Sequence, residues 1–484
     1  MTTANSVVQT TDLLRDGQWV AASDNGTFAV VDPATETLVA DVARATPDDV
    51  EAAIAGARKG FDRWRDTDAW ERSAVLRRAA GLIRERVEEI AALMTAEQGK
   101  PLGEARGETL AAADQYDWYA DEARRIYGRI VDGHGPGKNI YVRREPVGVV
   151  AAFSTWNFPA LLASRKIAPA LAAGCAVIVV PAEETPLTTL AVVGALVDAG
   201  VPAGVVQTLT GDGAQISEQL VASPVIRKVS LTGSVPVGRA VLRAAAENIT
   251  DVVLELGGHA PVLVFADADI EQAATACVAA KFRNAGQVCA SPSRFFVQED
   301  AFAEFIDHFV TATRALVVGD GRDPRTNVGP LTNSRRIDAA EALIADATRA
   351  GASVAVGGHR APGFEKGHFF SPTVLADVPH TAAIMRDEPF APVAPLTSFR
   401  TFEEAIELAN STEFGLASYV FTSDLNTAMS ASRSIEAGMV AVNHMALATA
   451  EAPFGGVKKS GFGREGGAEG VADYTTVKYV SVAG

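Results

Sequence analysis

Cys289 is the residue of this chain best suited to act as a nucleophile. It lies in the segment Asn284-Ala-Gly-Gln-Val-Cys289, where small residues such as Gly286 let backbone or ligand approach closely. A thiolate here would attack an electrophilic carbon. The alternative is a buried structural thiol, because unpaired cysteines are among the most buried residues. For Cys175 and Cys277, which lie in alanine-rich helical segments, we favour the structural interpretation.

Glu255 has the type and place of a general base. It ends the apolar run VVLE and is followed by the Gly257-Gly258 pair. A carboxylate in a partly apolar site has a raised pKa, which brings its proton affinity toward working pH. The alternative is a solvated acid at the end of a strand. The local sequence leaves both interpretations open.

Two further segments supply hydrogen-bond donors. Asn157, in the segment STWNFP, follows an apolar run and is either a turn residue or an amide donor to a developing oxyanion. Gly233 and Ser234 follow another apolar run and open a helix, where free N–H groups and the helix dipole suit a phosphate. The glycine spacing there matches the usual dinucleotide-binding pattern poorly, so the segment by itself is a weak signal.

The elements that must position these residues alternate along the chain. From about Val147, short apolar runs (GVVAAF, AVIVVP, VVQTL, KVSLTG, DVVLELGG) alternate with helical stretches (SRKIAPALAAG, TTLAVVGALVDAG, VGRAVLRAAAE). This alternation predicts a doubly wound parallel sheet, an α/β fold that binds ligands at the carboxyl ends of its strands. A second series from about Gly258 to Ala446, with strands such as PVLVFA and RFFVQ, predicts a second α/β domain.

The N-terminal part and two outlying segments complete the organisation. Thr46 is the expected N-cap of a helix that begins at Pro47. A second, longer helix is expected to carry one apolar face from Val75 to Met94 and to stop near Gly99. The hairpin GRIVDGHGPGKNIYVRREP and the tail DYTTVKYVSVA belong to neither series. Our hypothesis is that they add strands to the sheet of another subunit.

Composition bounds the function. A chain of 484 residues is expected to form two or three units. Its net charge of −16 argues against nucleic acid and acidic membranes as partners. Three scattered cysteines and seven histidines without a ligand pattern predict no disulfide framework and no metal site. The first residues lack a signal-peptide pattern, and the apolar stretch 167–180 is too short to span a bilayer. We therefore expect a cytoplasmic protein.

Together these segments resemble the aldehyde dehydrogenase superfamily, from about Asp32 to Val480. The motifs occur in family order, and the spacing between Glu255 and Cys289 also fits. They are WNFP (156–159), PAEETP (181–186), TGS (232–234), LELGG (254–258), GQVC (286–289), EPF (388–390), PFGG (453–456) and SG (460–461).

The resemblance implies a fold of three parts. A Rossmann-like cofactor-binding domain would span residues 1–125 and 147–257. A catalytic α/β domain would span 258–455. A small β oligomerisation element would be built from residues 126–146 and 466–484. Members of the family usually form homodimers or homotetramers, and the resemblance implies the same here.

The resemblance also implies an oxidation through a cysteine thioester. Cys289 would attack the aldehyde, Asn157 and the Cys289 N–H would hold the oxyanion, and Glu255 would activate the water that hydrolyses the thioester. NAD would be the cofactor, with Glu388 on the nicotinamide ribose and Glu183 on the adenosine ribose. The full set of cofactor-binding residues would be Trp156, Glu183, Gly233, Ser234, Glu388 and Phe390.

The substrate clues are fewer. Arg165 and Arg283 stand where succinate-semialdehyde dehydrogenases carry two arginines for the substrate carboxylate, and Thr449 corresponds to a hydroxyl of those enzymes. Each arginine taken alone is better explained as a surface or ion-pair residue. As a pair we favour substrate binding, and the expected substrate is a short semialdehyde bearing a carboxylate. Ser291 stands where those enzymes often have a second cysteine, so other semialdehyde acids stay open.

Val180 is the largest departure from the family. The family usually has a lysine immediately before Pro181 that binds the adenosine ribose, and an aliphatic side chain cannot donate that hydrogen bond. This departure motivates an alternative, a cofactor-poor thioesterase or esterase that uses Cys289 and Glu255. A non-catalytic scaffold is a third possibility, against which the complete set of catalytic residue types argues.

Overall fold

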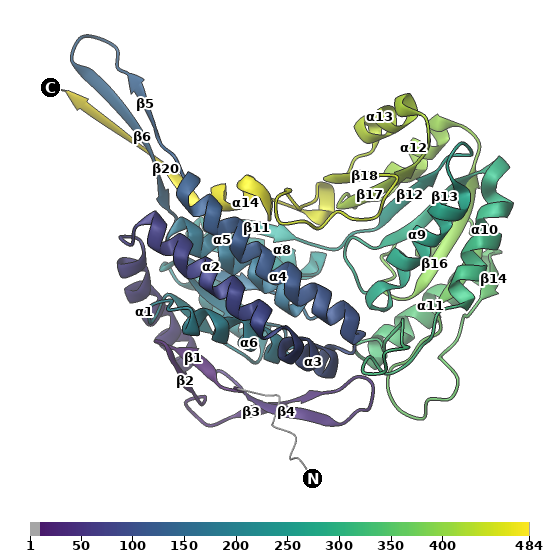
Figure 1. The fold of residues 1–484 in the computed structure, drawn as a ribbon, viewed down its shortest axis with the longest axis horizontal. Coiled ribbons are helices and arrows are strands. Elements are labelled where there is room, and N and C mark those ends of the chain that lie inside the picture. Colours follow the sequence, from purple (N-terminus) through teal and green to yellow (C-terminus); the bar gives the residue numbers. More distant parts are fainter. Residues whose placement is uncertain (1–9, 484) are drawn as a thin grey trace.

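The computed structural model describes residues 10–483 and contains two α/β units and a projecting three-stranded sheet (Figure 1). The first nine residues of the predicted cofactor-binding domain and the last residue of the predicted oligomerisation element, Gly484, lie outside the described residues. The division of the chain into domains stays a prediction, and each unit is described below by its sheet.

The first unit is built on a six-stranded sheet in the order β19-β11-β10-β7-β8-β9, parallel except for β19. Alternate residues of its central strands face opposite helical layers. In β7, Val150 and Ala152 pack with α2, α4, α5 and α6, whereas Ala151 packs with α1, α7 and α8. The expected doubly wound sheet is therefore confirmed. Its strands are β7 (Val149–Phe153), β8 (Ala176–Val180), β9 (Val206–Thr208), β10 (Ile226–Thr232), β11 (Asp251–Glu255) and β19 (Gly461–Phe462).

Helices cover both faces of this sheet. The predicted N-cap at Thr46 is confirmed, because its side chain and that of Asp49 form a reciprocal capping box. The bounds of the helices are α1 (Pro47–Trp64), α2 (Ala69–Glu85), α3 (Val87–Gln98), α4 (Leu102–Glu122), α5 (Pro159–Ala173), α6 (Pro186–Asp198), α7 (Gly213–Ala222) and α8 (Val235–Asn248).

The prediction of one long second helix was wrong. The helix breaks at Arg86, whose φ of −97° and ψ of 14° separate α2 from α3. Apolar residues on both sides of the break pack into the same core, so the apolar pattern continues across it and conceals the break. The predicted stop near Gly99 is correct, since Gly99 adopts a left-handed φ of 92°.

The second unit contains a seven-stranded sheet in the order β14-β15-β16-β13-β12-β17-β18, parallel except for β14. This confirms the expected second α/β series. Its strands are β12 (Ala260–Val264), β13 (Pro292–Gln298), β14 (Ser353–Val356), β15 (Thr373–Ala376), β16 (Val393–Phe399), β17 (Ala417–Phe421) and β18 (Met439–Val442). Its helices are α9 (Ile270–Phe282), α10 (Glu299–Arg314), α11 (Ser334–Ala350), α12 (Phe402–Asn410) and α13 (Leu425–Ser434).

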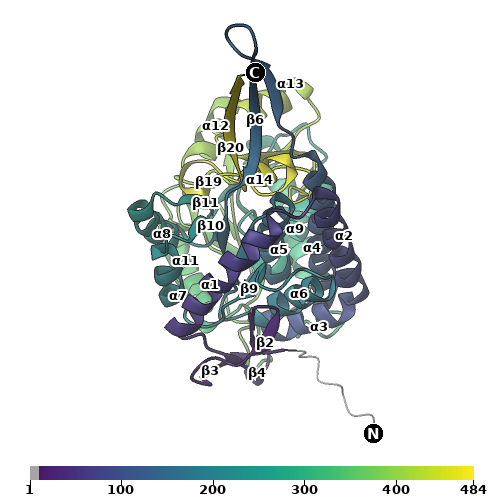
Figure 2. The ribbon, with the colours of Figure 1, turned by 90° about the vertical axis from the view of Figure 1, so that its left-hand side faces the viewer.

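The hairpin and the tail form one sheet in the order β20-β6-β5, which projects from the first unit (Figures 1 and 2). Several large apolar side chains on it are exposed, including Ile130, Val477 and Tyr479. The short helix α14 (Gly467–Ala472), which precedes the tail strand, packs instead on α4 and α5. The strands of the projecting sheet are β5 (Arg129–Asp132), β6 (Lys138–Pro146) and β20 (Thr475–Ala483). Two small N-terminal sheets pair β1 (Leu13–Arg15) with β2 (Gln18–Val20) and β3 (Thr27–Val31) with β4 (Leu38–Ala43).

The apolar stretch 167–180 consists of the end of α5 and strand β8, and all of it is buried inside the first unit. No helix in residues 10–483 has both the length and the apolar character that crossing a membrane requires. Over the same residues, no group of three or more His, Cys, Asp or Glu side chains is placed to hold a metal ion.

Candidate active site

The loop that carries Cys289 joins α9 to β13 through an unusual backbone. Asn284, Ala285 and Gly286 adopt left-handed φ values of 48°, 54° and 74° in succession. Such values are unfavourable for residues with a side chain, and they tend to persist at functional sites where the surroundings hold them. Gly286 is required, because a Cβ there would lie 2.3 Å from the Ala391 carbonyl oxygen. The loop brings Cys289 to a cavity between the two units.

That cavity has a volume of about 490 Å³ and gathers most of the residues that the sequence singles out. They come from the ends of β7 and β10, from the loop before β13 and from the loop before β16. The predicted site residues that line it are Trp156, Asn157, Gly233, Ser234, Cys289, Glu388 and Phe390.

The Cys289 thiol is partly exposed to this cavity but electrostatically unfavourable for a thiolate. Burial and the carboxylates of Glu388 and Glu255 raise its pKa to about 12, and the guanidinium of Arg165 acts in the opposite direction. The thiol is therefore protonated at neutral pH in this state. Forming the nucleophile requires a group that takes its proton.

Glu255 has the properties of such a group. Its side chain is 3% exposed at the end of β11, and neither carboxylate oxygen has a hydrogen-bond partner among residues 10–483. Burial and the nearby Glu465 raise its pKa well above the usual value, while Lys166 lowers it. Gly455 leaves the room that this carboxylate needs, since a Cβ there would lie 2.7 Å from Glu255 Oε1.

The side-chain amide of Asn157 is held in one orientation. Its Oδ1 accepts a hydrogen bond of 2.7 Å from the Thr155 hydroxyl, and its Nδ2 donates to the Gln287 carbonyl at 3.1 Å. A primary amide has two N–H groups, so one remains for another acceptor. Asn157 lies in the same cavity wall as Cys289, where that second N–H can serve a ligand.

The Gly257-Gly258 pair lies at a close contact between the two units. The Gly258 N–H donates to Glu388 Oε1 at 3.1 Å, and a Cβ at Gly257 would lie 2.5 Å from Glu388 Oε2. A Cβ at Gly258 would lie 2.5 Å from the Cys289 carbonyl oxygen. Gly258 is therefore needed for this backbone approach, whereas a side chain at Gly257 would displace the Glu388 carboxylate. Burial raises the pKa of Glu388 to about 8, against the opposing effect of the Gly258 N–H.

The cavity fits a nicotinamide dinucleotide. Ser234 is the N-cap of α8, and its side chain makes no capping hydrogen bond, so the helix N-terminus can accept a phosphate. The buried Thr232 hydroxyl beside it has no partner in the described part of the chain. Trp156 and Phe390 stand edge to face with ring centroids 5.5 Å apart. These groups offer donors for a pyrophosphate and apolar walls for a ring.

Glu183 lines a neighbouring cavity of about 460 Å³ rather than the one that contains Cys289. Partial burial and the nearby acids Asp212 and Glu184 raise its pKa, and Arg44, which lines the same cavity, lowers it. Val180 is 2% exposed, and its side chain packs into the core between β8 and α1. The position of the missing lysine is thus filled by a core residue.

The three predicted substrate residues lie in different surroundings. Arg165 is 2% exposed, with its guanidinium 4.2 Å from the centroid of the Phe454 ring, and its Nε and Nη2 lack partners among the residues that the structure describes. Arg283 is exposed and lies over Phe158 at 5.1 Å, at a separate cavity of about 720 Å³. Thr449 is exposed at a third cavity of about 450 Å³ beside α4. The structure does not bring these residues together in the cavity of Cys289.

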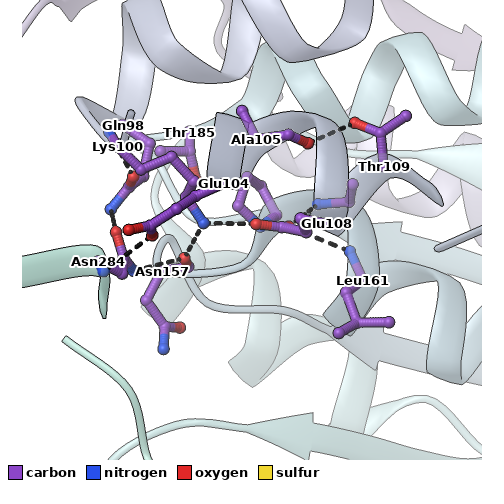
Figure 3. Close-up of polar contacts among 12 residues, drawn as sticks. Gln98, Lys100, Glu104, Ala105, Glu108, Thr109, Asn157, Leu161, Thr185 and Asn284 are labelled. Atoms are coloured by element: carbon purple, nitrogen blue, oxygen red, sulfur yellow. Dashed lines mark hydrogen bonds and ion pairs between the residues drawn. The ribbon is translucent and has the colours of Figure 1, made fainter. Parts of the chain in front are cut away.

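Sequence reasoning missed the buried charged residues behind the site. Lys100 pairs with Glu108, and Lys166 pairs with Glu465 next to Glu255 (Figure 3 shows the first pair). One signal was present, because Glu108 falls on the same face of α4 as the buried residues Ala105 and Ala112. A charged residue on an apolar helical stripe indicates a buried partner.

Comparison with known proteins gives a consistent result. The aldehyde dehydrogenase family matches residues 19–480. The chain is 43% identical to 3-sulfolactaldehyde dehydrogenase of Pseudomonas putida, over 97% of this chain and 96% of the relative. It is 41% identical to succinate-semialdehyde dehydrogenase [NADP(+)] of Escherichia coli, over 97% of each chain.

Solved structures agree. Succinate-semialdehyde dehydrogenase from Burkholderia pseudomallei superimposes with a TM-score of 0.97 at 41% identity, over 100% of this chain and 99% of the other. Betaine aldehyde dehydrogenase from Staphylococcus aureus in complex with NAD+ superimposes with a TM-score of 0.96 at 33% identity, over 98% and 95% of the two chains. These similarities confirm the expected fold.

Proposed function

Because the chain belongs to the aldehyde dehydrogenase family, we propose that it oxidises a short aldehyde bearing an anionic group, such as a semialdehyde, to the carboxylic acid with NAD. The observation that carries this proposal is one cavity lined by Cys289, Asn157 and Glu388. A nucleophile, an amide donor and a carboxylate for a ribose are thus supplied by three separate segments. The alternative of a cofactor-poor thioesterase is not favoured, because the groups suited to a dinucleotide are present.

The first half-reaction joins the aldehyde to the protein. Glu255 takes the Cys289 proton, directly or through water, and the thiolate sulfur attacks the aldehyde carbon. The carbonyl oxygen becomes an oxyanion that accepts hydrogen bonds from the free Asn157 N–H and the Cys289 backbone N–H. The chemistry that NAD supplies when bound is acceptance of a hydride from this carbon. What remains on Cys289 is a thioester.

The second half-reaction releases the acid. Glu255 first releases to solvent the proton it took from Cys289. It then removes a proton from water, and the water oxygen attacks the thioester carbonyl. The carbon–sulfur bond breaks, the carboxylic acid leaves, and Glu255 returns its proton to the Cys289 sulfur, which regenerates the thiol. The raised pKa of Glu255 suits this role, because a base works best when its pKa lies near the operating pH.

For the cofactor, we propose that Glu388 binds the nicotinamide ribose, Ser234 and Gly233 the pyrophosphate, and Glu183 the adenosine ribose. Trp156 and Phe390 would form the walls around the ring. The acidic surroundings of Glu183 support NAD over NADP, because a 2′-phosphate would meet like charges there.

For the substrate, the buried guanidinium of Arg165 supports an anionic group, because its Nε and Nη2 have no hydrogen-bond partner among residues 10–483. Its charge lowers the pKa of both Cys289 and Glu255. The guanidinium of an arginine binds a planar carboxylate well, because two parallel N–H groups can donate to its two oxygens. The aldehydes named for two relatives also carry an anionic group, a sulfonate in 3-sulfolactaldehyde and a carboxylate in succinate semialdehyde. Arg283 and Thr449 would contribute only if the loops that carry them move toward the site.

For assembly and location, we propose a homodimer or homotetramer in the cytoplasm. The exposed apolar side chains of the projecting sheet support pairing with a second copy, and a reducing compartment keeps Cys289 in its thiol form. In this proposal residues 1–125 and 147–257 bind the cofactor, 258–455 carry the nucleophile, and 126–146 with 466–484 join subunits. Light scattering after size-exclusion chromatography would measure the oligomer size.

The deciding experiment is a spectrophotometric assay of reduced cofactor. Succinate semialdehyde, a sulfonated aldehyde and butyraldehyde are each supplied with NAD or NADP. We expect NADH to form fastest with one of the two anionic aldehydes. Ester hydrolysis without any NADH formation would instead support the thioesterase, and equal rates with butyraldehyde would remove the anionic group from the proposal.

A further inference from the structure

Lys100 is a fully buried lysine behind the wall of the catalytic cavity. It lies between α3 and α4, is 1% exposed and follows Gly99 in its left-handed conformation. A buried ammonium is costly unless its hydrogen bonds are satisfied. Its contacts therefore show what its burial serves.

The contacts of Lys100 lead to two elements of the site (Figure 3). Its Nζ pairs with Glu108 of α4 and donates to the Asn157 carbonyl oxygen at 2.7 Å. It also lies 4.0 Å from the centroid of the Phe158 ring. The other oxygen of Glu108 accepts hydrogen bonds from the backbone N–H groups of Ala160 and Leu161, at 2.9 and 3.2 Å. The pair thus holds both Asn157 and the first turn of α5, which follows it.

The same carbonyl joins Asn157 to the nucleophile loop. Asn284 Nδ2 donates to the Asn157 oxygen at 3.0 Å, and Gln98 Nε2 in turn donates to Asn284 Oδ1 at 2.9 Å. The Asn284 backbone N–H donates to Glu104 at 2.9 Å. Residues 98–108, which do not line the catalytic cavity, therefore hold the two segments that do.

We propose that Lys100 is a positioning residue that, through the Asn157 carbonyl, aims the Asn157 amide at the oxyanion formed on Cys289. This inference rests on the proposed function, in which Asn157 is the oxyanion donor. The backbone at Asn157 sets where its amide can reach, and a misplacement of about 1 Å can cost about a hundredfold in rate. Lys100 holds the carbonyl of that backbone, and the Asn157 side chain points away from Lys100 (Figure 3).

The test replaces the ion pair as a unit. Lys100→Met alone leaves Glu108 buried and unpaired, so a loss of stability would confuse the result. Lys100→Met/Glu108→Gln removes both charges and keeps an acceptor for the N-terminus of α5. Lys228→Met is the matched control, because Lys228 is equally buried. It lies near the start of β10 and pairs with Asp251, the first residue of β11, at the end of the sheet opposite the catalytic cavity.

We measure NADH formation, hydrolysis of p-nitrophenyl acetate without cofactor, NAD binding by calorimetry and thermal unfolding. The double variant is expected to lower kcat in both reactions about ten- to hundredfold while NAD affinity and the KM for aldehyde stay within about twofold. Lys228→Met is expected to keep its kcat. Equal losses of kcat in Lys228→Met and the double variant would show a general effect of destabilisation and overturn the proposal.

A cycle with Asn157→Ala separates this inference from the proposed function. If Lys100 acts through Asn157, the triple variant Lys100→Met/Glu108→Gln/Asn157→Ala should have a kcat within about twofold of that of Asn157→Ala alone. A full additional loss, or no loss in the double variant when Asn157 is intact, overturns the inference alone. Unchanged kcat in Asn157→Ala itself would instead remove Asn157 from the proposed mechanism and overturn both.

Discussion

The two sheets present opposite edges to the catalytic cavity. In the first unit, Asn157 follows β7, Ser234 follows β10 and Glu255 ends β11, so the carboxyl ends of the strands face the site. In the second unit, Cys289 precedes β13 and Glu388 precedes β16, so the amino ends face it. The usual rule that open α/β sheets bind ligands at their carboxyl ends describes only one side of this site.

The difference has an electrostatic consequence. Helices begin at the edge of the first sheet, as α5 does after Asn157 and α8 does at Ser234, and their N-termini favour negative charge. At the edge of the second sheet, α9 ends at Phe282 before the nucleophile loop, so the helix that leads to Cys289 presents its C-terminus there, which does not favour a thiolate. The nucleophile of the second unit therefore depends on groups that the first unit supplies.

The largest effect is expected from removing the contribution of the second unit. Cys289→Ala should reduce both aldehyde oxidation and ester hydrolysis to less than about a few per cent of wild type, because no other group forms the thioester. The far-ultraviolet spectrum and the unfolding temperature should stay unchanged. Substantial activity in this variant would show that the cavity does not work through Cys289.

Glu255→Gln tests the contribution of the first unit. We expect a loss of about a hundredfold or more in turnover, because the amide cannot take a proton from water. A first-turnover burst of NADH that survives would place the main role of Glu255 in thioester hydrolysis. The wild-type rate should also rise with pH through the raised pKa of Glu255, since the base must be ionised, and this rise should vanish in the variant. A pH profile that does not change would assign the base elsewhere.

Arg165→Gln tests the buried charge of α5 that lowers the pKa of both Cys289 and Glu255. We expect succinate semialdehyde to lose its advantage over butyraldehyde in kcat/KM by about ten- to hundredfold, since one charge-assisted hydrogen bond contributes roughly 1.5–3 kcal/mol. The pH profile should also shift upward, because Arg165 lowers the pKa of both Cys289 and Glu255. Arg283→Ala is the comparison, with a smaller expected loss because its guanidinium is exposed. A larger loss in Arg283→Ala would reverse the ranking that burial predicts.

The smallest effect concerns the cofactor side of the first unit. Val180→Lys should tighten NAD binding by about tenfold, because it restores a charged donor worth roughly 1.5–3 kcal/mol to the adenosine ribose. Val180→Met is the control, being long and apolar. Calorimetry that finds equal NAD affinity in all three proteins would mean that Arg44, beside Glu183, already compensates. Tighter binding of NADP than of NAD to wild type would contradict the role proposed for Glu183.

Much of the first unit was readable from the sequence. Each predicted strand from Val149 to Glu255 is a strand in the structure, because fully buried parallel strands are continuous apolar runs bounded by glycine or proline. Asn157, Ser234 and Glu255 could be placed near one another by the same logic, since carboxyl ends of parallel strands share one edge. The apolar pattern was less informative at Arg86. One continuous helix and two helices that pack into the same core give the same spacing of apolar residues, so the break could not be predicted.

What the sequence by itself determined, then, is the order of elements, the carboxyl-end half of the site and, through its motifs, the family. Only the tertiary structure decided which edge of the second sheet faces the cavity. The residue pattern of a strand does not depend on which of its two ends lies near a ligand. It also decided that Arg165 is buried while Arg283 is exposed, and that Lys100 stands behind Asn157. Burial of a charged side chain depends on partners distant in the chain, and no local pattern records which partner is near.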